Sequence, residues 1–139
     1  MADFDTLFAA ASAARARAHA PYSNYFVGAA LLADDGKVYT GCNVENAAYP
    51  EGWCAETTAI GHLVMAGARK IVRAVVVADR IDHARVPGGR FCTPCGGCRQ
   101  RLMEFAASPS IEIWAADPEG KSQRFTMAEL LPAGFVLED

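Results

Sequence analysis

Residues 71–78 read IVRAVVVA, an apolar run in which β-branched valine and isoleucine dominate. Such a run is typical of a strand whose two faces are both buried, and it favours at least one parallel neighbour. A strand of this kind needs a layer of secondary structure on each side of its sheet. Together with the order of the helical and extended segments around it, this strand predicts a layered α/β domain with a mixed sheet and helices on its faces.

The segments on both sides of this strand alternate between helical and extended patterns. Asp35-Gly36 is a hairpin signal between two extended segments. Thr93 and Pro94 are typical of the N-cap and the first position of a helix. The expected elements are helices at 3–19, 54–66 and 94–107, strands at 25–33, 37–42, 71–78, 111–116 and 123–125, and a last helical turn opened by a capping box of Thr126 and Glu129.

The composition fits one domain, residues 1–139. Of its 139 residues 52% are hydrophobic, which is enough for a core that buries about two-thirds of the unfolded surface. No repeat, linker or low-complexity tract divides the sequence. The formal net charge of −3 argues against a protein that binds nucleic acid, because binding to phosphates needs clustered Lys and Arg. A small-molecule partner is therefore expected.

The N-terminal residues do not follow the pattern of a secretion signal. Asp3 and Asp5 stand where such a signal has basic residues, and Arg15 and Arg17 follow the apolar part. No run reaches the roughly 18–20 apolar residues that cross a bilayer. Five cysteines are an odd number, unlike the paired framework of small secreted proteins. We therefore expect a cytoplasmic protein without a membrane partner, whose thiols serve metal binding or catalysis.

Cys95 and Cys98 lie in the sequence PCGGC, residues 94–98. If Pro94 is the first helical residue, the two cysteines lie three positions apart on one face of the first turn, and both sulfurs can reach one metal ion. The helix N-terminus also favours thiolate over thiol. The pair is therefore expected to bind zinc.

Cys92 precedes this helix, so its side chain has no reason to share that face. The sequence CTPC, residues 92–95, could also be a redox dithiol. That interpretation requires a reactive cysteine at a helix start after a thioredoxin-type strand, whereas here Pro94 falls inside the pair. We expect Cys92 to be an inert or partly buried thiol.

Cys54 opens another helix, in the sequence CAE. Together with Cys95 and Cys98 it would give three thiolates, which leaves one open position on a tetrahedral zinc ion, as in catalytic sites. Glu56 can reach back beside the metal because Cβ vectors lean toward the helix N-terminus. Its carboxylate is then suited to moving protons, although a first-turn Glu that only the helix dipole favours is an equally good interpretation of this residue alone.

The combination of CAE and PCGGC, about forty residues apart, resembles the zinc-dependent nucleoside and nucleobase deaminases. With PYSNYFVGAALL (21–32), DGKVYTGCNVENAAY (35–49) and ELLPAGF (129–135), the chain is similar to short, single-domain cytidine deaminases over nearly its whole length. This resemblance implies a mixed five-stranded sheet with helices on both faces and a homotetramer with one Zn²⁺ per subunit. It also implies that the chain hydrolyses cytidine and 2′-deoxycytidine to the uridines, releasing ammonia, in pyrimidine salvage.

The resemblance assigns each chemical role to a motif. Zinc binding falls to Cys54, Cys95 and Cys98, and proton transfer falls to Glu56.

Recognition of the nucleoside is assigned to other motifs. In GCNVEN, Asn43 and Glu45 would hold the ribose hydroxyls, whereas without the resemblance both fit ordinary turn residues. Tyr25 stands at the family's aromatic position near the substrate, and the backbone around Ala55 would contact the base. Tyr49 and Phe135 occupy positions that could complete the site of a neighbouring subunit.

Two features depart from the family pattern. Many short cytidine deaminases carry an arginine at the position of Thr57, where it offsets the charge of the thiolates. Three thiolates and Zn²⁺ sum to −1, so helix dipoles, Arg99 or another basic residue must compensate here. The loop 79–92, which holds His83 and Cys92, looks longer than the usual connection.

The sequence leaves other activities open. A blasticidin-type deaminase shares the PCGxCRQ and ELLP motifs, although Asn43 and Glu45 favour an ordinary ribose. A structural zinc module would close the metal shell with Cys92 or Cys42 as a fourth ligand. A polynucleotide-editing deaminase would need a basic groove and stacking aromatics that this acidic chain does not display.

Overall fold

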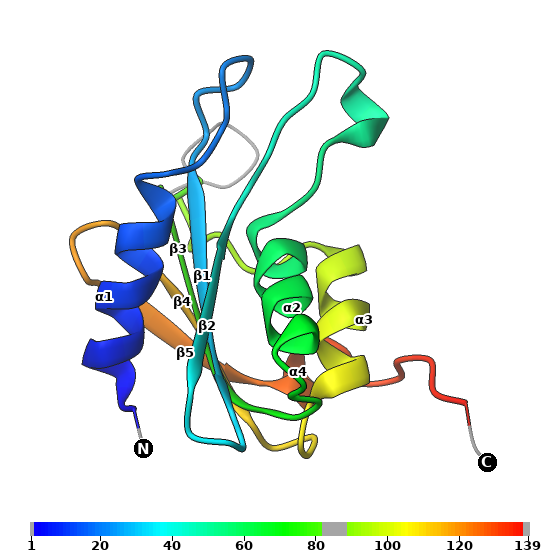
Figure 1. Ribbon diagram of the computed structural model, residues 1–139. Coiled ribbons are helices and arrows are strands. Elements are labelled where there is room, and N and C mark those ends of the chain that lie inside the picture. Colours follow the sequence, from blue (N-terminus) through cyan, green and yellow to red (C-terminus); the bar gives the residue numbers. More distant parts are fainter. Residues whose placement is uncertain (1, 82–88, 138–139) are drawn as a thin grey trace.

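The computed structural model describes residues 2–81 and 89–137 (Figure 1). Its elements are α1 (Phe4–Arg15), β1 (Val27–Ala33), β2 (Val38–Cys42), the 3₁₀ helix η1 (Tyr49–Glu51), α2 (Ala55–Met65), β3 (Ile71–Ala78), α3 (Gly96–Phe105), β4 (Glu112–Ala116), β5 (Ser122–Thr126) and α4 (Met127–Leu130). The expected order is confirmed, with η1 as an addition. Within the described ranges no helix is long and apolar enough to cross a membrane.

Strand β3 lies at the centre of the sheet, whose order is β2-β1-β3-β4-β5. It pairs antiparallel with β1 and parallel with β4, so that Val75 lies between Ala30 and Trp114. All its residues except Val72 and Arg73 are buried. The parallel neighbour that the apolar run predicts is therefore confirmed, and so is a mixed five-stranded sheet.

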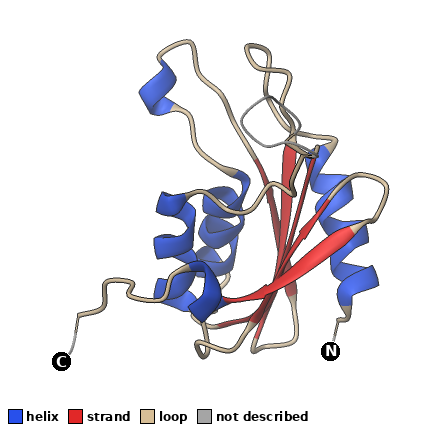
Figure 2. Cartoon of the chain, turned by 180° about the vertical axis from the view of Figure 1, so that it is seen from behind, coloured by secondary structure: helices blue, strands red, loops and turns tan. Residues whose placement is uncertain are grey.

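Helices cover both faces of the sheet, as Figures 1 and 2 show. Helix α1 lies on one face, where Leu7 packs in a buried cluster with Leu32. Helices α2 and α3 lie on the other face, where Leu63 and Leu102 join a larger cluster with Leu31. Neighbouring residues of β1 thus belong to different cores, because side chains alternate along a strand. The helices that carry CAE and PCGGC therefore stand together on one side of the sheet.

Helix α1 ends earlier than expected, at Arg15 rather than at residue 19. The residues after it pair with a distant loop: His19 forms a parallel β-bridge with Val44. His19 N donates to the Asn43 carbonyl at 3.1 Å, and Glu45 N donates to the His19 carbonyl at 2.8 Å. This tertiary pairing overrides the helical pattern of the Ala-rich segment and fixes the loop that carries Asn43 and Glu45.

Helix α3 begins later than expected, with Cys95 rather than Thr93 as its N-cap. The Arg99 guanidinium holds the preceding residues outside the helix, because it donates to the Pro94 carbonyl at 2.8 Å and to Thr93 Oγ1 at 2.9 Å. It also donates to the Leu130 carbonyl of α4 at 2.9 Å. Thr93 is therefore a partner of Arg99 and does not cap the helix.

Candidate functional site

Three cysteines from two helix starts come together beside the sheet. Cys54 is the N-cap of α2 and Cys95 is the N-cap of α3, whereas Cys98 lies in the first turn of α3. Neither N-cap side chain bonds the backbone of its own helix, so both sulfurs are free for another partner. The three Sγ atoms lie within 4.8 Å of one another, and no other such group occurs among the described residues.

The geometry and chemistry of this cluster fit a zinc ion. Thiolates at about 2.3 Å from a tetrahedral zinc have sulfurs about 3.8 Å apart. Cys54 Sγ lies 3.8 Å from Cys95 Sγ. Three protein ligands leave the fourth position open, as in catalytic zinc sites. The two helix N-termini add partial positive charge beside the thiolates. The structure thus brings together the three cysteines that the sequence proposes as ligands.

Glu56 lies in the first turn of α2, two residues after Cys54. Its side chain is only 4% exposed, yet it lines the same cavity as Cys54 and Cys95. Burial raises the pKa of the Glu56 carboxyl, and the positive charge of Arg101 acts against that rise. A buried carboxyl with a raised pKa beside a candidate metal centre is suited to accept and donate protons.

One cavity of about 590 Å³ joins the cysteine cluster to the loops around it. A volume of this size is typical of sites for small molecules. The expected substrate residues that line it are Tyr25, Asn43, Glu45, Tyr49 and Ala55. Polar groups suited to a sugar and thiols suited to a metal therefore line the same cavity.

The family model described as the zinc-binding region of cytidine and deoxycytidylate deaminases matches residues 1–111. The chain belongs to this family. It is 41% identical to a cytidine deaminase of Sporosarcina psychrophila over 99% of this chain and 94% of that protein. It is 40% identical to a cytidine deaminase of Halalkalibacterium halodurans over 99% of this chain and 97% of that one. The crystal structure of cytidine deaminase from Burkholderia pseudomallei is similar at a TM-score of 0.83 and 40% identity, covering 96% of this chain and 100% of that chain.

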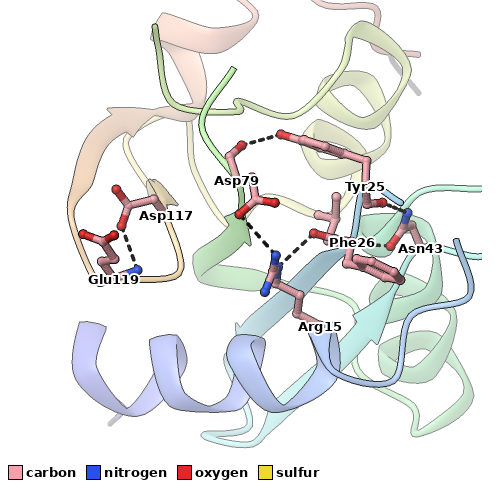
Figure 3. Close-up of polar contacts among 8 residues, drawn as sticks. Arg15, Tyr25, Phe26, Asn43, Asp79, Asp117 and Glu119 are labelled. Atoms are coloured by element: carbon pink, nitrogen blue, oxygen red, sulfur yellow. Dashed lines mark hydrogen bonds and ion pairs between the residues drawn. The ribbon is translucent and has the colours of Figure 1, made fainter. Parts of the chain in front are cut away.

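In this member of the deaminase family, hydrogen bonds brace two of the expected substrate residues (Figure 3). Asn43 Oδ1 accepts from Val27 N at 2.8 Å, and Asn43 Nδ2 donates to the Tyr25 carbonyl at 2.8 Å. The Tyr25 hydroxyl donates to the Asp79 carbonyl, and the Asp79 carboxylate pairs with Arg15 at 3.3 Å. The Asn43 amide keeps one N–H and one lone pair for a ligand.

The turn at residues 22–23 holds the Glu45 carboxylate. Oε1 accepts from Tyr22 N at 3.0 Å and from Ser23 N at 3.2 Å, and the Ser23 hydroxyl donates to Oε2. The Ser23 hydroxyl and these amides lower the pKa of Glu45, so that the carboxylate is ionised at neutral pH. The sequence reasoning missed Ser23, although its place in a short polar turn before the strand was the available signal.

Phe135 lies apart from the cavity. Its backbone is fixed by Gln100, which accepts from Phe135 N at 3.0 Å and donates to the Phe135 carbonyl at 2.8 Å, while the residue is 66% exposed. Tyr49 lines the cavity but is 75% exposed, and its ring contacts the ring of Tyr22 edge-on. A contribution of Phe135 and Tyr49 to a neighbouring subunit stays a prediction.

Cys92 lines the cavity but is not a member of the three-cysteine group. Burial raises the pKa of the Cys92 thiol. Cys42 lies at the end of β2 and is likewise outside the group. His83, which the loop 79–92 also holds, falls outside the described residues.

Cys92→Ser is expected to keep zinc content and turnover within about twofold of the wild type, because Cys92 is outside the three-cysteine group and serine keeps the size of the side chain. Metal analysis and an activity assay on the purified variant check this. A variant that loses its zinc would instead support the closed, four-cysteine module.

Proposed function

We propose that this protein is a zinc-dependent cytidine deaminase, which hydrolyses cytidine and 2′-deoxycytidine to the uridines and releases ammonia. The observation that carries the proposal is a single cavity lined by Cys54 and Cys95 of the three-cysteine cluster, by buried Glu56, and by Asn43 and Glu45. A nucleoside needs this combination, because its amino group must meet the reacting groups while its sugar is held elsewhere. Relatives that span nearly the whole chain carry the name cytidine deaminase.

Glu56 is the group that moves protons. Zinc, when bound by Cys54, Cys95 and Cys98, supplies an activated water by lowering its pKa to about 7. Glu56 would accept one proton of that water and deliver it to N3 of the ring, and it would then carry the second proton, from the hydroxyl formed at C4, to the amine that departs as ammonia. The low exposure of Glu56 keeps bulk water away from these transfers.

Asn43 and Glu45 are the groups that hold the ribose. The amide of Asn43 offers one donor and one acceptor, while Glu45 offers an ionised acceptor that the turn at residues 22–23 fixes in place. Such paired donors and acceptors recognise a neutral sugar by hydrogen bonding. The backbone of Ala55 and the aromatic rings of Tyr25 and Tyr49 complete the cavity around the base and sugar.

Glu45→Gln is expected to raise KM for cytidine about 10- to 150-fold with a smaller effect on kcat, since a charged hydrogen bond contributes about 1.5–3 kcal/mol. Steady-state kinetics check this, with Glu51→Gln as a control because Glu51 lies in the nearby helix η1 but does not line the cavity. A substrate that lacks the ribose hydroxyls, 2′,3′-dideoxycytidine, should show little difference between Glu45→Gln and the wild type. An equal rise in KM for both substrates would contradict a contact between Glu45 and the ribose hydroxyls.

Assembly and location extend this proposal. The residues Phe135, Val136 and Leu137 are exposed apolar residues near the C-terminus, as apolar contacts between subunits require. These residues are available for the subunit contacts of the proposed homotetramer. Light scattering can measure the mass of the assembly in solution. We place the enzyme in the cytoplasm, within pyrimidine salvage.

The test of the activity is direct. Zinc-loaded protein is incubated with cytidine, 2′-deoxycytidine or blasticidin, and the loss of the amino-pyrimidine absorbance is followed. Conversion of cytidine and 2′-deoxycytidine supports the proposal, whereas conversion of blasticidin alone supports the related deaminase. No change with any of them excludes a cytosine-nucleoside deaminase.

A further inference from the structure

We propose that Arg101 is a positioning residue of the metal centre, which donates to the Cys98 sulfur and offsets the negative charge of the three thiolates. The inference rests on the proposed zinc-dependent function. Position 57, next to Glu56, holds an uncharged threonine, so a charge from another position is required.

The Arg101 guanidinium lies beside the Cys98 sulfur. Arg101 Nη1 lies 3.8 Å from Cys98 Sγ, within hydrogen-bonding distance for a sulfur acceptor, and donates to it. Cys98 and Arg101 are three positions apart on α3, and residues at this spacing share one face of a helix. Cys98 is fully buried whereas Arg101 is exposed, so the long side chain reaches from the surface to the sulfur.

Gly97 leaves the room that the guanidinium occupies. A Cβ atom at position 97 would come within 3.1 Å of Arg101 Nη1. Any larger residue would therefore press on the end of the Arg101 side chain. Gly97 thus leaves the guanidinium its place beside Cys98, and an added methyl group would shift the end of the Arg101 side chain by a few tenths of an ångström.

The other candidates for this charge are engaged elsewhere. All three nitrogens of the Arg99 guanidinium bond to Pro94, Thr93 and Leu130, as described above. Thr57 Oγ1 lies 4.0 Å from Cys98 Sγ, where a hydroxyl can donate weakly but carries no charge. Among the hydrogen bonds of the described residues, Arg101 therefore provides the cationic donor to the cysteine cluster.

The charge of the centre explains why this donor matters. Three thiolates and one Zn²⁺ sum to −1, and the cluster is partly removed from water. A cationic donor at one sulfur stabilises the thiolate and reduces its electron donation to the metal. Loss of outer-shell partners of this kind typically lowers metal affinity 10- to 100-fold.

The experiment measures zinc release, independently of turnover. Zinc-loaded Arg101→Met is mixed with a chromogenic chelator, and we expect release 10- to 100-fold faster than from the wild type. Arg17→Met is the matched control, because Arg17 is an exposed arginine beyond the end of α1 and its loss changes the net charge equally. Release from Arg17→Met should equal that of the wild type.

A rescue variant and a spectrum separate this role from a merely structural one. Thr57→Arg combined with Arg101→Met returns a cation from position 57, where the native threonine hydroxyl lies 4.0 Å from the same sulfur, and it should slow zinc release back toward the wild-type rate. In the cobalt-substituted protein, Arg101→Met should move the thiolate-to-metal charge-transfer band to lower energy, because the sulfur loses its donor.

Wild-type release from Arg101→Met, or faster release with an unmoved band and no rescue, would overturn the inference. Arg101→Gln provides a second variant if Arg101→Met does not fold, since it also removes the positive charge and should also speed release. If the wild type holds zinc but converts no cytosine nucleoside, the proposed function fails while the release measurement still tests Arg101.

Discussion

Glu56→Ala is expected to bind one zinc per chain and to deaminate cytidine about 10⁴-fold more slowly than the wild type. The three sulfurs that form the candidate metal centre do not include Glu56, so the metal should stay. The loss should fall on kcat rather than on KM, because the carboxylate acts in the reaction and not in holding the ribose. Metal analysis and the absorbance assay, made on the same preparation, measure both quantities.

Two controls separate this effect from damage to the fold. Glu104→Ala removes an exposed carboxylate from α3 and should leave turnover unchanged. Glu56→Gln keeps the volume of the side chain, and it should be as inactive as Glu56→Ala. Burial raises the pKa of Glu56 in the folded state. The folded state is therefore destabilised as the pH rises above the pKa that Glu56 has in the unfolded chain, whereas Gln carries no charge and does not cause this destabilisation. Glu56→Gln without metal should therefore melt no lower than the wild type at neutral pH.

Turnover at the wild-type rate by zinc-loaded Glu56→Ala would exclude Glu56 as the proton carrier. The cavity would then need another acid and base. Loss of zinc from this variant would instead make Glu56 a partner of the metal centre.

The fold was predictable where local chemistry and burial agree. The run IVRAVVVA became β3 with the expected bounds, since β-branched residues suit a strand and this one is buried on both faces. The capping box of Thr126 and Glu129 also formed as expected. The candidate metal ligands could be predicted for the same reason, because helix starts are local features and Cys54 and Cys95 each stand at one.

The features that the sequence could not provide depend on contacts between distant segments. The end of α1 was misplaced because His19 pairs with Val44, far along the chain. The start of α3 was misplaced because Arg99 binds the residues before the helix. The sequence left the source of the compensating charge open among helix dipoles, Arg99 and another basic residue, and in the structure Arg101 contacts the Cys98 sulfur. The spacing of three residues from Cys98 was the signal that could have identified Arg101.

Cys98→Ser is expected to weaken zinc binding by at least about 100-fold, because an alcohol replaces a thiolate as ligand and even outer-shell changes cost 10- to 100-fold. Cys98 is fully buried in the first turn of α3, and its partners in the cluster include Cys54 at the start of α2, so loss of the metal would also remove a link between these two helices. Turnover should fall with zinc occupancy. Isothermal titration of the apoprotein with zinc measures the affinity, and metal analysis gives the occupancy.

The same substitution tests whether zinc contributes to stability. A hundredfold loss of affinity removes about 2.7 kcal/mol of metal-linked stabilisation at fixed zinc concentration. The wild type should therefore melt at a higher temperature with zinc than with a chelator, whereas Cys98→Ser should show little difference. Cys42→Ser serves as the control, since Cys42 is a partly buried thiol outside the cluster. If Cys98→Ser keeps both zinc and its metal-dependent melting shift, Cys98 is not a ligand, and the centre would have to be completed by a different residue.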